Sequence, residues 1–262
     1  MASSPTLSDA APVLETRGLT VVFGGHVAVA GVSCAFHRDS LTAIVGPNGA
    51  GKTTYFNLIS GQLRASAGSV HLGDADITRL GAAERTRRGL GRAFQLTSLF
   101  PNLSVLENVR LAVQAQARIG LDLLGMAAHR RALIDKARAT LDRVKLGHRA
   151  ESPAAALSHG DQRKLEVAVL LAIEPQVFMF DEPTAGMSVD EVPVILDLIE
   201  EIKAAGRHTI LLVEHKMDVV RRLADRVIVL HEGALVADGV PAEVVNSAIV
   251  REAYLGLRAA AQ

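Results

Sequence analysis

The sequence has little cysteine, few aromatic side chains and no net charge. Cys34 is its only cysteine, so no disulfide can form within the chain, and the alternating pattern around this residue predicts a buried thiol rather than a reactive one. Aromatic residues make up 3% of the chain and the formal charge is zero, so both the stacking surface and the basic footprint of a nucleic-acid-binding protein are absent. We therefore expect no nucleic-acid partner, and a reducing compartment.

Long apolar runs are also absent. No segment offers the uninterrupted stretch that crosses a bilayer, and Met1–Pro12 lacks a basic region followed by an apolar core. We expect residues 1–12 to be a frayed leader and the chain to be soluble, which leaves docking to a membrane protein possible. With 262 residues and 49% hydrophobic content, the remainder can bury one core, or a core with a smaller attached lobe.

A glycine-rich loop dominates what is present. It follows the apolar run Leu41–Val45, precedes the helix-compatible run Thr54–Ser60, and consists of Gly46, Pro47, Asn48, Gly49, Ala50, Gly51, Lys52, Thr53 and Thr54. Its glycines permit a backbone that turns successive N–H groups around a phosphate at the positive end of a helix. Lys52 can reach the β- and γ-phosphates, and the Thr53 hydroxyl is placed to bind Mg²⁺. The full G-x-x-x-x-G-K-[ST] string between a strand and a helix predicts a P-loop.

Short β-compatible runs broken by glycines precede the P-loop, from Val13 to Phe36, and predict a small antiparallel sheet. Phe23 stands at one of these breaks. Its ring could stack on a purine base or be an ordinary strand hydrophobe, and the residues alone favour neither.

After the P-loop helix, the sequence predicts a basic helix over Ala82–Arg88, whose arginines we interpret as a solvated face. A strand then ends at Gln95. The loop Leu99–Pro101 that follows carries large apolar residues, which are either tucked into the core or reserved for a partner. Ser104 and Glu107 have the S-x-x-E form of a capping box at the start of a helix.

Two further helices are predicted over Ala127–Val144 and Gly160–Ile173. The first forms part of a helical lobe. The second begins with Leu157-Ser158-His159-Gly160-Asp161, and an N-cap serine with an acidic first turn explains Ser158 and Asp161 without any ligand.

Two apolar strands end in polar residues. Val177–Phe180 leads into Asp181 and Glu182, and His208–Val213 leads into Glu214 and His215. The carboxyl ends of parallel strands are where an α/β sheet gathers its ligands. Neighbouring residues on a strand point in opposite directions, so we expect a metal-side role for Asp181 and a water-side role for Glu182.

Together and in this order, these features resemble the nucleotide-binding subunit of an ABC transporter over about Leu14–Leu255. The strings "FGGHVAVAGVS", "FQLTSLFPNLSVLENV", "DEPTAGM" and "EAYLG" are similar to the ATP-binding subunits of branched-chain amino-acid importers. The resemblance implies an α/β fold: a P-loop NTPase core with a mixed or parallel sheet, an N-terminal antiparallel β subdomain and a helical subdomain at about 96–175, all within one domain over 13–262.

The resemblance also implies the site, with ATP and Mg²⁺ as cofactors. Gly46–Thr54 would be the Walker A motif and Phe23 the aromatic that stacks on adenine. Thr53 and the phosphates would hold the metal, with Gln95 of the Q-loop and Asp181 of Walker B close to it. Glu182 would polarise the attacking water. Lys52 and the switch histidine His215 would stabilise charge on the γ-phosphate. The signature residues Ser158, His159, Gly160 and Asp161 would contact the ATP of a second subunit.

Three departures from the family pattern stand out. The signature is usually LSGGQ and is LSHGD here; the LSHG form is similar to the urea or short-chain amide branch, which stays open as an alternative. Asp161 should repel a γ-phosphate unless its helix N-terminus, Arg163 or Lys164 compensates. Ser188 stands where the family has an aspartate.

The resemblance implies an ATP hydrolase that energises import at the cytoplasmic face of the plasma (inner) membrane, as a peripheral subunit. Its partners would be a second ABC ATPase, the same or a homologous chain, stacked head to tail, two membrane permeases and, indirectly, an extracytoplasmic solute-binding protein. The loop after Gln95 would contact the permeases. Alternatives of another class are a soluble P-loop kinase and an ABC ATPase without a transport role.

Overall fold

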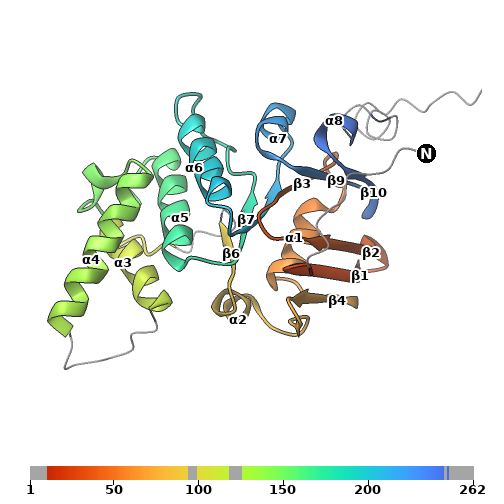
Figure 1. Cartoon of the computed structure of the whole chain (residues 1–262), viewed down its shortest axis with the longest axis horizontal. Coiled ribbons are helices and arrows are strands. Elements are labelled where there is room, and N and C mark those ends of the chain that lie inside the picture. The colour runs from red at the N-terminus through yellow and green to blue at the C-terminus, as the bar shows by residue number, and fades with distance from the viewer. Residues whose placement is uncertain (1–10, 94–98, 118–125, 245–246, 248–262) are drawn as a thin grey trace, which may run out of the picture. The chain divides into compact units, whose positions relative to one another are not determined.

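The computed structural model describes residues 11–93, 99–117, 126–244 and 247 (Figure 1). It divides into a first unit, Met1–Ala82 with Gly206–Gln262, and a second unit, Ala83–Ala205. Most of the expected leader and the string "EAYLG" lie outside the described residues. Within the described part, no helix combines the length and the apolar character needed to span a membrane.

A four-stranded antiparallel sheet occupies one side of the first unit. In spatial order its strands are β2 (His26–Phe36), β1 (Leu14–Phe23), β4 (Ala67–Leu72) and β5 (Ala75–Asp76). Gly24 and Gly25 join β1 to β2 with φ angles of 52° and 89°, a conformation that a side chain disfavours. The predicted N-terminal antiparallel sheet is confirmed.

Parallel strands form the rest of the first unit's sheet structure. They are β3 (Leu41–Val45), which lies between β8 (Thr209–Val213) and β9 (Arg226–His231), with β10 (Ala234–Gly239) antiparallel to β9. Every residue of β3 and β8 is buried, as expected for parallel strands covered on both faces. Three helices belong to this unit: α1 (Lys52–Ser60), α7 (Met217–Leu223) and α8 (Pro241–Val244).

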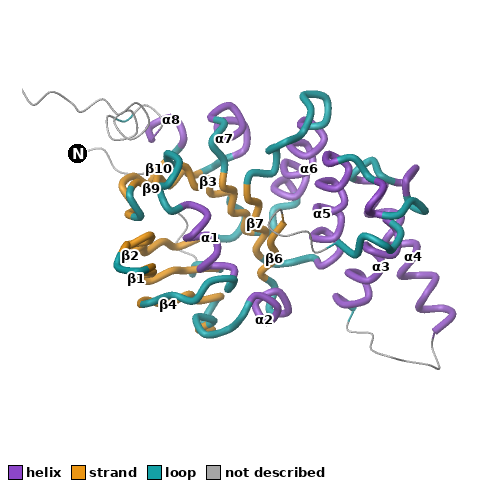
Figure 2. The backbone as a smooth tube through the Cα atoms, turned by 180° about the vertical axis from the view of Figure 1, so that it is seen from behind, coloured by secondary structure: helices purple, strands orange, loops and turns teal. Residues whose placement is uncertain are grey.

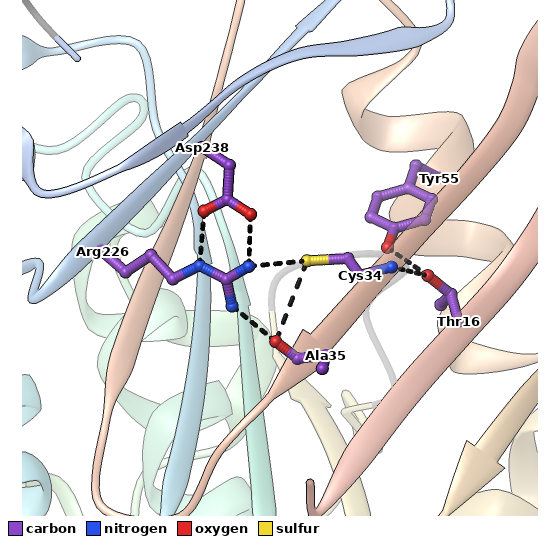
Figure 3. Close-up of polar contacts among 6 residues, drawn as sticks. All are labelled: Thr16, Cys34, Ala35, Tyr55, Arg226 and Asp238. Atoms are coloured by element: carbon purple, nitrogen blue, oxygen red, sulfur yellow. Dashed lines mark hydrogen bonds and ion pairs between the residues drawn. The ribbon is translucent and has the colours of Figure 1, made fainter. Parts of the chain in front are cut away.

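A polar network that runs from exposed Asp238 to buried Tyr55 links four strands of the first unit to α1 (Figure 3). Arg226 of β9 is paired with Asp238 of β10 and donates to the Cys34 sulfur at 3.5 Å. The Cys34 amide donates to Thr16 Oγ1 at 3.1 Å, and that hydroxyl lies 2.8 Å from the Tyr55 hydroxyl of α1. Burial raises the pKa of the Cys34 thiol to about 11, against the opposing effect of Arg226. The predicted burial of the thiol is confirmed.

The second unit combines two parallel strands with a group of helices (Figure 2). Its elements are α2 (Ala82–Arg87, which begins at the unit boundary), β6 (Leu90–Ala93), α3 (Val105–Gln116), α4 (Met126–Arg143), the 3₁₀ turns η1 (Gly147–Arg149) and η2 (Ala154–Ala156), α5 (His159–Ile173), β7 (Val177–Asp181) and α6 (Val192–Ala204). The helices α3, α4 and α5 pack against one another. The apolar residues at helical spacing in α4 include Leu133, Ala137 and Leu141, which are buried, and Ile134, which is partly buried.

The basic helix α2 differs from its interpretation as a solvated face. Arg87 and Arg88 are exposed and contact Glu84, but Arg85 is only 2% exposed. The interpretation is wrong for Arg85, because a helix packed on one side buries the residue that faces inward whatever its charge. The capping prediction for α3 is confirmed, since Ser104 Oγ accepts a hydrogen bond from the Glu107 amide at 3.1 Å.

Candidate nucleotide-binding site

The P-loop connects β3 to α1 in the first unit, as predicted. Gly46 and Gly51 have φ angles of 151° and 92°, and a Cβ on either would overlap a backbone oxygen, that of Leu230 or of Ala28. Gly49, with φ of 82°, faces open space instead. Glycine is therefore required at Gly46 and Gly51 by close packing, and at Gly49 by the backbone conformation.

Lys52 and the start of α1 give the P-loop a positive character. The Lys52 side chain folds back over the loop, where Nζ donates to the carbonyl oxygens of Gly46 at 2.7 Å and Pro47 at 2.9 Å. Lys52 is only 7% exposed, whereas Asn48 and Gly49 are exposed. Gly51 is the N-cap of α1 and makes no side-chain cap, so the first turn presents its backbone N–H groups. This arrangement fits an anion.

Two other segments of the first unit brace the P-loop. The Gly233 amide donates to Ala50 O at 3.1 Å, and Gly233 O accepts from the Ala30 amide at 2.9 Å. The same stretch of β2 lies against Gly51, because a Cβ on Gly51 would come within 2.5 Å of Ala28 O. The conformation of the P-loop is thus supported by strand β2 and by the β9–β10 turn, both of which lie outside the P-loop in sequence.

This bracing brings the β1–β2 hairpin end to the P-loop, since Val27 directly precedes Ala28. Phe23, in the hairpin with His26 as its partner, is 47% exposed, and the nearby Val22 and Val27 are 41% and 43% exposed. An ordinary core hydrophobe would be covered. Of the two readings of Phe23, the exposed ring available for stacking agrees better with the structure.

His215 lies at the same sheet edge as the P-loop. The register pairs Val213 of β8 with Ile44 of β3, so both chains leave the sheet together at its carboxyl edge. Glu214 is fully buried, and its Oε2 accepts hydrogen bonds from the amides of His215 at 2.9 Å and Lys216 at 3.1 Å. The His215 side chain is half exposed. The buried Glu214 carboxylate therefore holds the turn that presents the histidine.

In the second unit, Asp181 ends β7 in a buried ion pair. Arg92 of β6 places Nη2 2.7 Å from Asp181 Oδ2, and both side chains are 6% exposed. Burial lowers the pKa of the Arg92 guanidinium, while the neighbouring Asp181 carboxylate acts to raise it. The pair fixes the orientation of the carboxylate at the strand end.

Glu182 follows directly, but the expectation that strand alternation separates it from Asp181 is wrong. Strand β7 ends at Asp181, and Glu182 has a φ angle of 49°, in the left-handed region. Its carbonyl oxygen accepts a hydrogen bond from the Ala185 amide at 3.0 Å. A turn, rather than the pleat of the strand, separates the two carboxylates. Positive φ in a residue with a side chain is strained and is frequent at functional sites.

The signature segment begins α5. Ser158 is the N-cap, and its Oγ accepts a hydrogen bond from the Asp161 amide at 3.1 Å, as the capping interpretation predicted. Asp161 Oδ1 lies 2.9 Å from Lys164 Nζ, while Arg163 contacts Glu166. His159 is exposed and lies near Gly186. A Cβ added to Gly186 would lie 3.0 Å from the Nε2 atom of His159.

The predicted site residues are divided between the units. Phe23, Gly46–Thr54 and His215 belong to the first, whereas the signature, Asp181 and Glu182 belong to the second. Gln95 lies outside the described residues. In the first unit, the contacts above bring the P-loop near the hairpin end and the β8 turn. In the second unit, the start of α5 lies near Gly186 and Glu191, which follow β7 in sequence.

Sequence reasoning missed three supporting residues, Arg92, Glu191 and Gly233. Of the two cations named as possible partners of Asp161, Lys164 makes the contact and Arg163 pairs with Glu166 instead. The GRAFQ string places Arg92 in register with Met179, two residues before the β7 end at Asp181, and this was a usable signal once the parallel pairing of β6 with β7 was assumed. Gly233 donates a hydrogen bond to Ala50 of the P-loop, which is 183 positions away in sequence. No local sequence pattern could predict this contact.

Comparisons with known proteins agree with this geometry. Residues 29–185 match the family model described as ABC transporter, and residues 234–260 match the model described as branched-chain amino acid ATP-binding cassette transporter. The chain belongs to the ABC transporter family. It is an ATP-binding cassette of this family, with the α/β fold expected from the sequence.

Relatives named for branched-chain amino acid transport match along nearly their full length. The chain is 38% identical over 250 residues to the high-affinity branched-chain amino acid transport ATP-binding protein LivG of Salmonella typhimurium, covering 94% of this chain and 98% of the relative. It is 34% identical to the corresponding protein BraF of Pseudomonas aeruginosa, with the same coverage. A solved ATP-binding cassette of an ABC transporter in its ADP conformation is 30% identical, with a TM-score of 0.78 over 94% of this chain and 99% of that chain.

Proposed function

We propose that this ABC cassette hydrolyses ATP to energise a branched-chain amino-acid importer at the cytoplasmic face of the plasma membrane. The observation that carries the proposal is the match of residues 234–260 to the branched-chain cassette model, because this part lies outside the catalytic motifs that all ABC ATPases share. The near-complete coverage of relatives named for branched-chain amino acid transport supports the same substrate class.

ATP would bind at the P-loop of the first unit. The N–H groups at Gly49–Thr54 and the Lys52 ammonium would hold the phosphates, and Phe23 would stack on the base. Magnesium, with Thr53 as a protein ligand, would neutralise phosphate charge. Among the described residues, no cluster of three or more His, Cys, Asp and Glu side chains could hold a metal. A single hydroxyl ligand from Thr53 suits Mg²⁺, because this ion keeps waters and phosphate oxygens as most of its ligands.

Hydrolysis would use the carboxylates of the second unit. Asp181, together with Gln95, would orient the water shell of the metal, and Glu182 would accept a proton from the attacking water. Lys52 and His215 would stabilise the charge that develops on the γ-phosphate. The ion pair with Arg92 supports a positioning role for Asp181, and the turn at Glu182 supports a separate role for that carboxylate.

A second ATPase subunit would complete each site head to tail. The signature residues Ser158, His159, Gly160 and Asp161 would meet the γ-phosphate bound to the other P-loop. We keep the boundaries expected from the sequence, with a leader at 1–12, one cassette over 13–262 and a helical subdomain at about 96–175.

The loop after Gln95 would contact the two permeases. Phe100 is 55% exposed, so the alternative of a residue tucked into the core does not apply to it. Asn108, only 4% exposed, holds this loop: its Oδ1 accepts from the Phe100 amide at 2.8 Å and its Nδ2 donates to Phe100 O at 3.1 Å. An exposed apolar ring whose backbone is held by Asn108 suits a docking surface.

Growth and uptake in cells test the proposal. In the cells that naturally carry this chain, deletion of its gene should abolish ATP-dependent uptake of labelled leucine, and wild type but not Glu182→Gln should restore it. Labelled urea serves as the second substrate. Loss of urea uptake with leucine uptake intact would assign the chain to the urea or short-chain amide branch instead. Formation of ADP that requires an added acceptor, without release of inorganic phosphate, would point to the kinase alternative. Unchanged uptake of both solutes would point to an ABC ATPase without a transport role.

A further inference from the structure

The start of the signature helix is covered by a carboxylate of its own chain. The Glu191 carboxylate, at the start of α6, fills the space that a Cβ on Gly160 would take. Gly160 is consequently buried, although Ser158 and His159 beside it are exposed. Both residues belong to the second unit. The absence of a side chain at Gly160 thus lets an anion lie against the backbone of the signature.

Specific contacts hold this carboxylate in place. Glu191 Oε2 accepts hydrogen bonds from the Ser188 amide at 3.2 Å and the Ser188 hydroxyl at 3.0 Å, and Oε1 lies 3.5 Å from Lys164 Nζ. The hydrogen bonds from Ser188 lower the pKa of Glu191, with a smaller contribution from Lys164, so the group is anionic at neutral pH. Ser188 is the residue that departs from the family's aspartate, and here it serves as a donor to Glu191.

Lys164 joins this carboxylate to the other departure, Asp161. Its Nζ lies 2.9 Å from Asp161 Oδ1 as well as 3.5 Å from Glu191 Oε1, and its side chain is 11% exposed. The three groups carry two negative charges and one positive charge. Without a nucleotide, the first turn of α5 therefore holds a net negative charge where a γ-phosphate would dock.

We propose that Glu191 and Lys164 are positioning residues that regulate, with opposite sign, how readily the signature accepts the nucleotide of a second ATPase subunit. Glu191 occupies the helix start as an internal anion and must yield to the phosphate. Lys164 compensates Asp161 and Glu191 and keeps its ammonium at the place where the phosphate arrives. The inference rests on the proposed role of the signature at a second subunit.

A capping role alone makes different predictions. Ser188 and Glu191 have the S-x-x-E spacing of a capping box, in which the acidic side chain reaches back to the amide of the first residue. If capping were the whole role, removing the charge of Glu191 would lower the melting temperature and leave ATP-driven pairing unchanged. Removing the charge of Lys164 would then also leave pairing unchanged and affect only the melting temperature.

The experiment compares Glu191→Gln and Lys164→Gln in a Glu182→Gln background, which suppresses hydrolysis. Sedimentation velocity with ATP measures pairing of the full chain, or of the chain with its co-purifying second ATPase if it stays monomeric alone. Glu191→Gln should strengthen pairing and Lys164→Gln should weaken it, each by roughly two- to fivefold, the range for one partly exposed charge. Both effects should shrink at high salt, and Lys164→Arg should restore pairing.

Matched controls and a second readout separate this regulation from stability. Glu201→Gln removes a carboxylate from the same helix, where it pairs with Arg143, and Lys136→Gln removes a cation that pairs with Glu174. Neither should change pairing. ATP affinity of the monomer should be the same in all variants, because the altered residues are outside the P-loop. Equal signs for Glu191→Gln and Lys164→Gln, or changes in melting temperature without changes in pairing, would overturn the inference.

Failure of the proposed function gives a different experimental result. If the Glu182→Gln chain binds ATP but never pairs, either alone or with the second ATPase, the head-to-tail role of the signature is wrong and the inference is overturned together with it. If the parent chain pairs with ATP while both charge variants pair equally well, only the role assigned to Glu191 and Lys164 is wrong.

Discussion

Arg92 and Asp181 form a buried ion pair across β6 and β7, with Nη2 2.7 Å from Oδ2 and each side chain 6% exposed. An isolated charge in such a place would be costly, so the two side chains depend on each other. Because Asp181 is the proposed metal-side carboxylate, the pair links the stability of the second unit to the geometry of the site.

Arg92→Met should therefore destabilise the chain, since it leaves a buried carboxylate unpaired. We expect a loss of about 3 kcal/mol in the free energy of unfolding, the scale for removing one partner of a buried pair. Urea unfolding measures this loss, and Arg110→Met, which breaks the more exposed pair with Glu107, is the control. Equal effects of the two substitutions would contradict a special role for the Arg92–Asp181 pair.

The element order of this fold could be predicted from the sequence, because it depends on local patterns. The P-loop between β3 and α1, the Ser158 cap of α5 and the apolar run of β7 are all contained in short windows. Each window carries its own physical cause: glycine conformations, an N-cap side chain, or burial on both faces of a strand.

The supporting contacts could not be predicted, because they join residues distant in sequence. Arg92 and Asp181 are 89 positions apart, and Arg226 reaches Cys34 over 192 positions. The burial of Arg85 depends likewise on what α2 packs against. At Glu182 the expectation of strand alternation was wrong, because β7 ends at Asp181 and a positive φ in a glutamate has no local signal.

Lys52→Ala should lose most ATP affinity and essentially all hydrolysis. Its ammonium is held within the loop by the carbonyl oxygens of Gly46 and Pro47, where it is placed to meet phosphate. Fluorescent-nucleotide titration and phosphate release check the two effects. Lys136→Ala, which breaks an exposed pair with Glu174, is the matched control and should behave as wild type. Near-normal turnover of Lys52→Ala would reject the P-loop assignment.

Phe23→Ala should weaken nucleotide binding by about 1 kcal/mol, roughly fivefold in affinity, if its exposed ring stacks on the base. Because Phe23 is 47% exposed, the folded structure should be nearly unaffected. Titration with ATP measures the change, and Phe100→Ala, an exposed ring in the second unit, controls for general loss of apolar surface. An unchanged affinity for Phe23→Ala would show that the ring has no part in binding.

Asp161→Gln tests which role of this carboxylate dominates. Removing its charge at the start of α5 should strengthen ATP-driven pairing in the Glu182→Gln background and leave ATP binding to the monomer unchanged. The Ser158 cap does not depend on the Asp161 side chain, because Ser158 Oγ accepts from the Asp161 backbone amide. A lower melting temperature without stronger pairing would instead assign Asp161 to the acidic first turn, where it favours the helix dipole.

Glu182→Gln should separate binding from hydrolysis. The amide keeps the size of the side chain and removes its charge, so ATP should still bind, while phosphate release should fall by roughly 100-fold or more, the scale for loss of a general base. The closed pair of subunits should then accumulate with ATP and dissociate with ADP, as measured by size-exclusion chromatography.

Asp181→Asn provides the contrast, because its effect should appear at the binding step. Without the carboxylate, Mg²⁺-dependent ATP binding should weaken, and Arg92 would lose its charged partner, so unfolding must be measured alongside. Binding of ATP to Glu182→Gln with and without Mg²⁺ then serves as the reference.

Phosphate release from Glu182→Gln at the wild-type rate would overturn the catalytic assignment. Slow release without a stable pair would keep that assignment and show that a different second subunit is needed for closure.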